Sequence, residues 1–322
     1  MIKRLRQFAP LLLAAVCSVS VASSLKNDPI TIVSPFPPGG GTDTLTRMLA
    51  ETMAQQEGWT IVVENKPGAG GNLALGGTAR ANPNGHYLVM AQTDNIVLNP
   101  WLYKELPYDT FDDFVHIGLV ATSPSAYVVT PDSTIDSVGD LVEAAKENPG
   151  DLTLGIPGVG GTGDLLGRLF NNEAEIEISY IPFRGWSQAF PDLKAGRIDV
   201  YTGSVASLLP QIQSELVKPI GVISEQRSPA LPDVPTFVEA GYPNVDQAIW
   251  WGLMAPAGTP DDIITELNNA MVRAVSSEAM VKQLEAAGYS ALGSTPQEHE
   301  ARHREDHEVF GELVKASGLE PQ

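Results

Sequence analysis

Three histidines near the C-terminus have the spacing of a metal site. His299 and His303 enclose Glu300 in the H-E-x-x-H pattern, in which one helix presents two zinc ligands and a general base, and His307 follows one turn later. The flanking residues are polar on nearly every side of the predicted helix, whereas a catalytic zinc helix is buried beneath a cleft. We therefore interpret the stretch as a solvated amphipathic helix. Adventitious metal binding and a zinc protease are the alternatives.

A glycine-rich turn at residues 158–164 has the features of an anion-binding loop. Gly158, Gly160 and Gly163 match the G-x-G-x-x-G dinucleotide fingerprint, between a predicted strand at 152–156 and a predicted helix at 164–171. The match is mid-chain, and the export signal described below favours a compartment poor in nicotinamide cofactors. We therefore favour a smaller anion over a nucleotide, held by backbone N–H groups at the helix N-terminus.

A second glycine-rich turn, at residues 35–43, follows the first predicted strand. Pro38 is followed by Gly39, Gly40 and Gly41, and this exceeds what a plain turn before a capped helix requires. The glycines allow the backbone to point its N–H groups inward, and Asp43 can cap the following helix. This loop is the candidate anion site of the N-terminal part of the chain.

Both turns would lie at the carboxyl ends of parallel strands, where ligands of open α/β sheets bind. Two helix N-termini aimed at one cleft would form a carboxylate clamp. Thr162 could add a hydroxyl donor, and Arg184 either a charged fork or only a surface ion pair. Local donors must attract the anion, because the chain is strongly acidic overall.

Other catalytic patterns are weak. There is no Gly-x-Ser-x-Gly elbow, and His86 and His116 lie outside any recognisable triad. Trp250 and Trp251 begin a strand-like run through residue 256. Stacking on a ligand is one interpretation of these tryptophans, and packing into the core is the favoured one.

The N-terminus predicts export to the periplasm. Lys3, Arg4 and Arg6 precede a short apolar run at 9–16, and residues 20–22 suit cleavage after Ala22. Removing residues 1–22 takes away these three cations and no acid, so the formal net charge changes from −19 to −22, which disfavours nucleic acid and anionic membranes. Cys17, the single cysteine, fits a lipid-anchor site poorly, so the mature chain is expected to be soluble and free of disulfides.

The remaining 300 residues alternate β-rich runs with helical stretches, which predicts parallel sheets with crossover helices. Strand–turn–helix units form two groups, and a helical stretch at 261–316 closes the chain. We predict an α/β, two-lobed periplasmic binding protein fold (type II-like), each lobe a mainly parallel sheet flanked by helices, with the ligand cleft between the lobes. The expected boundaries are 23–123 plus 248–322 for the first lobe and 124–247 for the second.

The sequence resembles the Bug family, the periplasmic solute-binding proteins of tripartite tricarboxylate transporters, over essentially the whole mature chain. Each matching stretch is weak alone and the set is specific. The stretches are 35–43 with Arg47, 63–72, 106–109, 182–185, Asp192 and Leu193 with Gly196 and Asp199, 231–236 with Glu239 and Gly241, and 255–260.

The resemblance implies a closing two-lobed fold, no catalysis, no cofactor and a ligand carboxylate held partly through water. It carries ligand binding to Phe36, Gly39, Gly40 and Asp43 in the first lobe and to Gly161, Thr162 and Gly163 in the second; Asn72 and the loop at Gln92 and Thr93 transfer less surely. With Pro38, Asp164 and Arg184, these form our predicted binding site. The sequence departs from the family at Asp164, where a His-Leu pair is common; we interpret Asp164 as an N-cap, with a contact to a ligand amine or hydroxyl as the alternative.

The predicted function is therefore capture of a di- or tricarboxylate, an aromatic acid or an acidic amino acid by lobe closure. A monomer would deliver this ligand to the membrane subunits of the transporter. A sensor that presents its bound form to a membrane signalling partner shares the fold and remains open, as does a less favoured zinc- or nucleotide-dependent enzyme.

Overall fold

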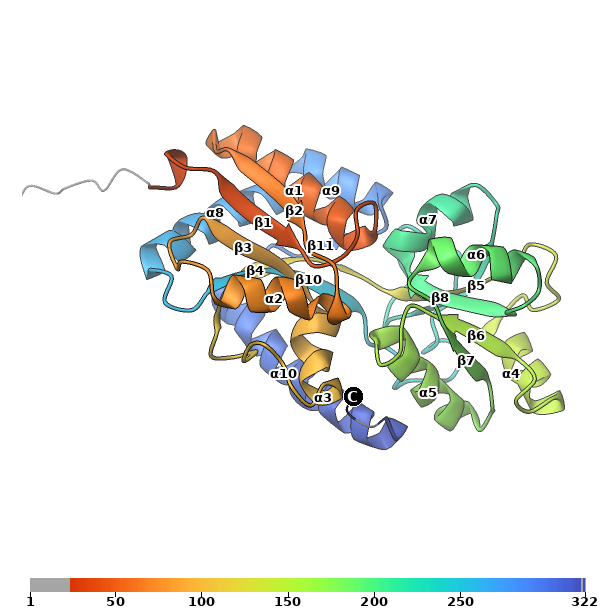
Figure 1. Cartoon of the computed structure of the whole chain (residues 1–322). Coiled ribbons are helices and arrows are strands. Elements are labelled where there is room, and N and C mark those ends of the chain that lie inside the picture. The colour runs from red at the N-terminus through yellow and green to blue at the C-terminus, as the bar shows by residue number, and fades with distance from the viewer. Residues whose placement is uncertain (1–23, 320, 322) are drawn as a thin grey trace, which may run out of the picture.

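Short runs of β-branched and aliphatic residues form the central strands of two lobes, which lie side by side in the computed structural model (Figure 1). The structure describes residues 24–319 and residue 321. The predicted signal segment, with Cys17, lies outside these residues. Within them, no helix is long and apolar enough to cross a membrane.

The first lobe has a six-stranded sheet in the order β11-β4-β10-β3-β1-β2. Its strands are β1 (Ile30–Ser34), β2 (Ile61–Asn65), β3 (Tyr87–Gln92), β4 (Phe114–Ser123), β10 (Ile249–Pro256) and β11 (Ser290–Ala291). Its helices are α1 (Gly41–Glu57), α2 (Asn72–Ala79), α3 (Asn99–Leu102), α8 (Asp261–Val275), α9 (Glu278–Ala286) and α10 (Pro296–Ser317), with short 3₁₀ turns at Ser24–Lys26 and Ala69–Gly71 and a π-helix at Asp94–Leu98.

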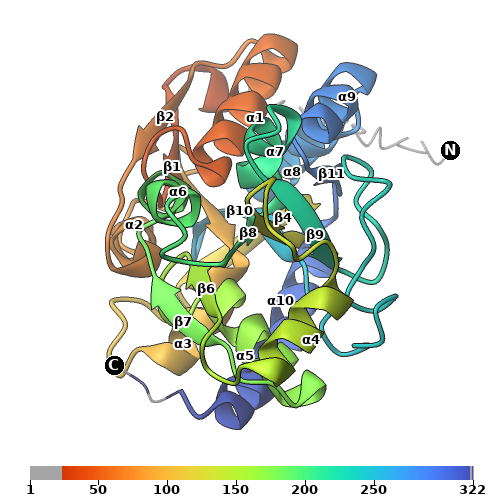
Figure 2. The same cartoon turned by 90° about the vertical axis from the view of Figure 1, so that its right-hand side faces the viewer.

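The second lobe has a five-stranded sheet in the order β7-β6-β8-β5-β9. Its strands are β5 (Ser125–Val129), β6 (Thr153–Ile156), β7 (Ser179–Pro182), β8 (Val200–Ser204) and β9 (Lys218–Ile223), and its helices are α4 (Val138–Glu147), α5 (Thr162–Ala174), α6 (Trp186–Lys194) and α7 (Val205–Gln213). Figure 2, which looks onto this lobe, shows α6 and α7 on one side of its sheet and α4 and α5 on the other.

The two-lobed α/β prediction is confirmed, but the sheets are mixed rather than mainly parallel. In the first lobe β1 pairs in parallel with β2 and β3, whereas β10 runs antiparallel to β3 and β4. In the second, β6 pairs in parallel with β7 and β8, whereas β5 runs antiparallel to β8 and β9. Two of the reversed strands lie at the crossings between lobes: the chain enters the second lobe on β5, directly after β4, and returns to the first on β10. The short β11 is also antiparallel to β4. We propose the predicted boundaries, 23–123 plus 248–322 and 124–247, for the two moving units.

The lobes are in contact through side chains as well as through the crossing strands. Leu165 of α5 is buried in the same apolar cluster as Val33 of β1 and Trp250 of β10. At the crossing itself, the Ser123 hydroxyl donates to the Gly288 carbonyl at 2.8 Å and accepts from the Ala206 N–H at 3.2 Å. The two lobes are therefore in direct contact in this structure.

The prediction of a solvated α10 is wrong for its inner face. His299 and His303 are both 0% exposed and pack between α10 and β4. Their partners are aromatic: His299 meets the Trp250 ring edge-on and His303 stacks on Phe111. Sequence polarity was misleading here because neutral imidazoles can serve as core side chains.

Gly252 of β10 leaves space for the His299 ring because it has no side chain. A Cβ at this position would lie 2.2 Å from His299 Cε1, whereas at Gly77 of α2 no atom lies within 4 Å of the corresponding position. We expect Gly252→Ala to lower the free energy of unfolding by about 1–3 kcal/mol through overpacking. The matched Gly77→Ala should be neutral or stabilising by up to about 1 kcal/mol, since alanine is the better helix former. Urea unfolding of both variants measures the difference, and equal effects would contradict the packing argument.

Candidate functional site

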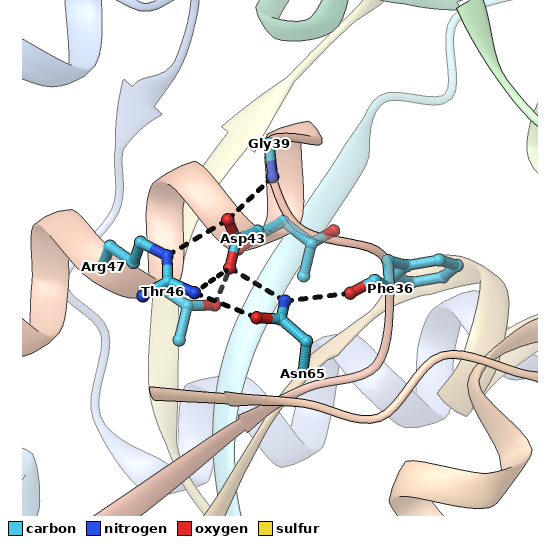
Figure 3. A network of polar contacts seen from close by, with 7 residues as sticks. Phe36, Gly39, Asp43, Thr46, Arg47 and Asn65 are labelled. Atoms are coloured by element: carbon cyan, nitrogen blue, oxygen red, sulfur yellow. Dashed lines mark hydrogen bonds and ion pairs between the residues drawn. The ribbon is translucent and has the colours of Figure 1, made fainter. Parts of the chain in front are cut away.

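The loop after β1 is closed by Asp43, as Figure 3 shows. The Asp43 carboxylate accepts from the Gly39 N–H at 2.8 Å, from Arg47 Nε at 3.1 Å and from Asn65 Nδ2 at 2.8 Å. Asn65 Nδ2 also donates to the Phe36 carbonyl at 3.0 Å. Burial opposes ionisation of Asp43, but the hydrogen bonds from Arg47, Gly39 and Asn65 outweigh it, so the pKa of Asp43 lies below its usual value. The Asp43 carboxylate therefore holds the loop through these hydrogen bonds.

The loop after β6 repeats this construction in the second lobe. Asp164, which is fully buried, accepts from the Gly160 N–H at 2.9 Å and from Arg168 Nε at 2.8 Å. Gly39 and Gly160 have nearly the same φ, +80° and +78°, in the left-handed region that favours glycine. Each lobe therefore presents a helix N-terminus on a loop that an aspartate and an arginine hold.

The structure corrects the N-cap interpretation of both aspartates. Gly40 and Gly161 are the N-caps of α1 and α5, both with extended backbone, and neither contributes a side-chain cap. Asp43 and Asp164 lie two residues inside their helices and reach back to the N–H of the residue before the cap. An aspartate at this position satisfies a loop donor and complements the helix dipole at once. Both side chains are buried, Asp43 at 3% and Asp164 at 0% exposed.

A chain of hydrogen bonds joins the two helix N-termini across the lobes. Trp251 Nε1 donates to Thr42 Oγ1 at 2.9 Å, and Thr42 Oγ1 donates to Gln92 Oε1 at 2.6 Å. Gln92 Nε2 donates to Asp94 Oδ2 at 3.2 Å. Asp94 Oδ1 in turn accepts from the Thr162 N–H at 3.0 Å and from the Thr162 hydroxyl. The structure thus brings Thr162 to the first lobe, although its partner is a protein carboxylate.

The other predicted residues are placed less centrally. The Asn72 amide oxygen is buried and already accepts from Asn99 Nδ2 at 2.5 Å and from the Tyr108 hydroxyl at 2.9 Å. Pro38, Gly39 and Gly40 form the exposed rim of the first loop, while Gly161 and Gly163 begin α5. Arg184 is exposed, and its backbone N–H donates to Gln188 Oε1 at 2.7 Å. Within residues 24–319 and 321 it makes no salt bridge, so the surface ion pair we considered is not formed there.

A separate opening at the lobe boundary does not coincide with these loops. It has a volume of about 590 Å³, and its lining includes Leu119, Arg227 and Arg302. None of the predicted site residues contributes to it. We therefore keep the two glycine loops as the candidate site.

The histidine cluster is arranged for packing and not for a metal. His116 Nε2 lies 3.0 Å from His303 Nδ1, while His303 Nε2 lies 3.0 Å from the Ile96 carbonyl. Burial lowers the pKa of His116 to about 4 and that of His303 to about 3. No group of three or more metal-ligating side chains with suitable geometry occurs in the described part of the chain.

Sequence reasoning missed Asp94 and the role of Thr42. Asp94 follows the carboxyl end of β3, and Thr42 lies in the first turn of α1. Ligands of α/β sheets bind at such positions, so the sequence held a weak signal for a binding role of both residues. The glycine-rich turns are the stronger sequence pattern. Trp250 and Trp251 are both 2% exposed, and the packing interpretation of these residues is confirmed.

Comparisons with family models, with curated sequences and with solved structures agree with one another. A model of the tripartite tricarboxylate transporter family receptor matches residues 45–319. The chain is 36% identical over 300 residues to the UPF0065 protein of the tcbD-tcbE intergenic region in Pseudomonas sp. (strain P51), which covers 92% of this chain and 89% of the relative. Among solved structures it is similar to periplasmic binding protein BugD (TM-score 0.83, 31% identity, 91% and 99% covered) and to R. palustris Rpa4515 with adipate (TM-score 0.86, 28% identity, 91% and 98% covered).

Proposed function

Because the chain belongs to the family of tripartite tricarboxylate transporter receptors, we propose that it captures a small carboxylate by lobe closure and delivers it to the membrane subunits of such a transporter. The family is one of periplasmic solute-binding proteins, which supports a periplasmic location and a binding role without turnover. Export would use the signal segment predicted at residues 1–22.

The observation that carries the proposal is the open donor set at the start of α1. The N–H groups of Gly41, Thr42 and Asp43 have no acceptor among the residues that the structure describes. They lie beside Gln92, which belongs to the chain of hydrogen bonds between the lobes. Backbone donors at a helix N-terminus suit a carboxylate.

Carboxylate capture is supported further by the way the loop is built. Asp43 holds the Gly39 N–H and Asn65 holds the Phe36 carbonyl, so the loop keeps its shape before a ligand arrives. A preorganised loop loses little conformational freedom on binding. Tyr289 adds a further restraint, because its hydroxyl donates to the Gly41 carbonyl at 2.7 Å.

Thermal unfolding of the mature chain against a panel of carboxylates tests the proposal, after refolding to remove any carried-over ligand. A ligand present at one hundred times its dissociation constant should add about 2.7 kcal/mol, which raises the midpoint by several degrees. The amide of each acid is the matched control, since it has the same carbon skeleton without the charge. A panel in which no carboxylate shifts the midpoint more than its amide would refute the proposal.

A further inference from the structure

The first turns of α1 and α5 differ, because that of α5 meets a carboxylate of the protein itself. We infer that Asp94 fills the anion position of the second lobe and thereby gives the chain a preference for ligands with one carboxylate over ligands with two. The inference rests on the proposed function and narrows its ligand class.

The contact is the one that a ligand carboxylate would make. Asp94 Oδ1 accepts both from the N–H of Thr162, the first residue of α5, and from the Thr162 hydroxyl. The first-turn N–H groups of a helix are the donors that bind carboxylates and phosphates. The Asp94 carboxylate therefore stands where the second lobe would hold an anion.

Comparison of the two loops shows that the difference lies in Asp94 and not in the loop. Both have a glycine near φ +80°, an aspartate that accepts its N–H, and an arginine four residues on. Among the residues that the structure describes, three first-turn N–H groups of α1 have no acceptor, whereas at α5 the Thr162 N–H and hydroxyl contact Asp94 and the Asp164 N–H donates to the Gly161 carbonyl. One position is open and its counterpart is filled.

Asp94 is held in place by the first lobe. It begins a π-helix, a rare element that is frequent at functional sites. The carbonyl of Asn95 accepts from the Tyr108 hydroxyl at 2.6 Å, and that of Ile96 accepts from the Thr110 hydroxyl at 2.5 Å. The Asn95 side chain also accepts from the Gln92 N–H at 3.0 Å. These contacts fix the backbone turn that carries Asp94, and Gln92 Nε2 donates to its carboxylate at 3.2 Å.

A ligand with two carboxylates would therefore meet an occupied position. Its second carboxylate would approach the half-buried Asp94 carboxylate at short range, and like charges repel there. The Thr162 donors that could offset this repulsion are already engaged. A methyl, hydroxyl or amide group at the same end of the ligand carries no charge and avoids the penalty.

Isothermal titration with matched acids tests the inference on the mature chain. The pairs are butyrate with succinate, hexanoate with adipate, and benzoate with terephthalate. We expect the wild type to bind the monocarboxylate of its best pair at least tenfold more tightly. Asp94→Ala should shift that ratio at least tenfold toward the dicarboxylate, and the exposed Asp112→Ala should leave it unchanged.

Asp94→Asn is the second variant, because it keeps the size of the side chain and removes its charge. It should shift the ratio of the two affinities in the same direction by a smaller factor. It also keeps the inference testable if Asp94→Ala fails to fold. A wild type that prefers dicarboxylates, or equal gains for both acids in Asp94→Ala, would overturn the inference alone. Absence of binding by every acid in both wild type and variants would overturn the proposed function as well.

Discussion

Acidification from pH 7 to pH 5 is expected to destabilise the protein steeply, and His299→Leu should remove a large part of that loss. His116, His299 and His303 form a buried cluster in which burial lowers the pKa of every member. Within the part of the chain that the structure describes, neither ring nitrogen of His299 has a hydrogen-bond partner, so no hydrogen bond there stabilises its charged form.

The direction of the pH dependence follows from the difference in histidine pKa between the folded and unfolded states. An unfolded histidine takes up a proton near pH 6.5, whereas His116 does so near pH 4 and His303 near pH 3 in the folded protein. Between these values the unfolded state binds more protons, so stability falls as the pH falls. Each buried neutral histidine then contributes a loss of about 1.4 kcal/mol per pH unit. The effect fades above about pH 7.5, where the unfolded histidines are also neutral.

Urea unfolding of wild type and His299→Leu at pH 7, 6 and 5 measures the effect. At pH 7 the variant should be as stable as the wild type or more stable, since an apolar side chain replaces a buried polar one without partners. Its loss between pH 6 and pH 5 should be smaller by about 1.4 kcal/mol. His307→Leu is the matched control, because His307 is half-buried and should change the slope less. Parallel curves for wild type and His299→Leu would contradict the role of the cluster.

Asp43→Ala is expected to weaken both the fold and ligand binding. The change removes the acceptor of Gly39, Arg47 and Asn65 together. We expect the free energy of unfolding to fall by about 2–3 kcal/mol, because the hydrogen bonds that the buried, charged carboxylate accepts are lost. Carboxylate affinity should fall at least tenfold, since the loop before α1 is then no longer preorganised.

Urea unfolding and titration with the best carboxylate measure the two effects of Asp43→Ala separately. Glu51→Ala is the control, because Glu51 is an exposed acid on the same helix. It should change stability by no more than about 0.5 kcal/mol and leave affinity unchanged. The stability and the affinity of Asp43→Asn should lie between those of Asp43→Ala and Glu51→Ala, because asparagine keeps the side-chain shape and loses the charge. Wild-type affinity in Asp43→Ala would exclude a positioning role for this loop contact.

Local sequence signals were sufficient for the elements of the fold. Local patterns predicted a strand at 152–156, which β6 (Thr153–Ile156) matches within one residue, and a strand-like run from Trp250 through residue 256, which β10 (Ile249–Pro256) matches equally well. These features depend on propensity and periodicity over a few neighbouring residues. The glycines also marked both helix N-termini, because positive φ at Gly39 and Gly160 is a local requirement of the turn.

Contacts between distant segments were decided only by the tertiary structure. The antiparallel course of β10 and β5 depends on how the chain crosses between lobes, and local patterns do not record strand direction. The polar helix α10 buries His299 and His303 because β4 and Trp250 meet it there. Asp94 lies 68 positions before Thr162 in the chain, so only closure of the lobes brings its carboxylate to α5. The sequence by itself determined a two-lobed chain with a glycine-rich turn before a helix in each lobe, whereas the folded arrangement decided that the Asp94 carboxylate meets the start of one of these helices.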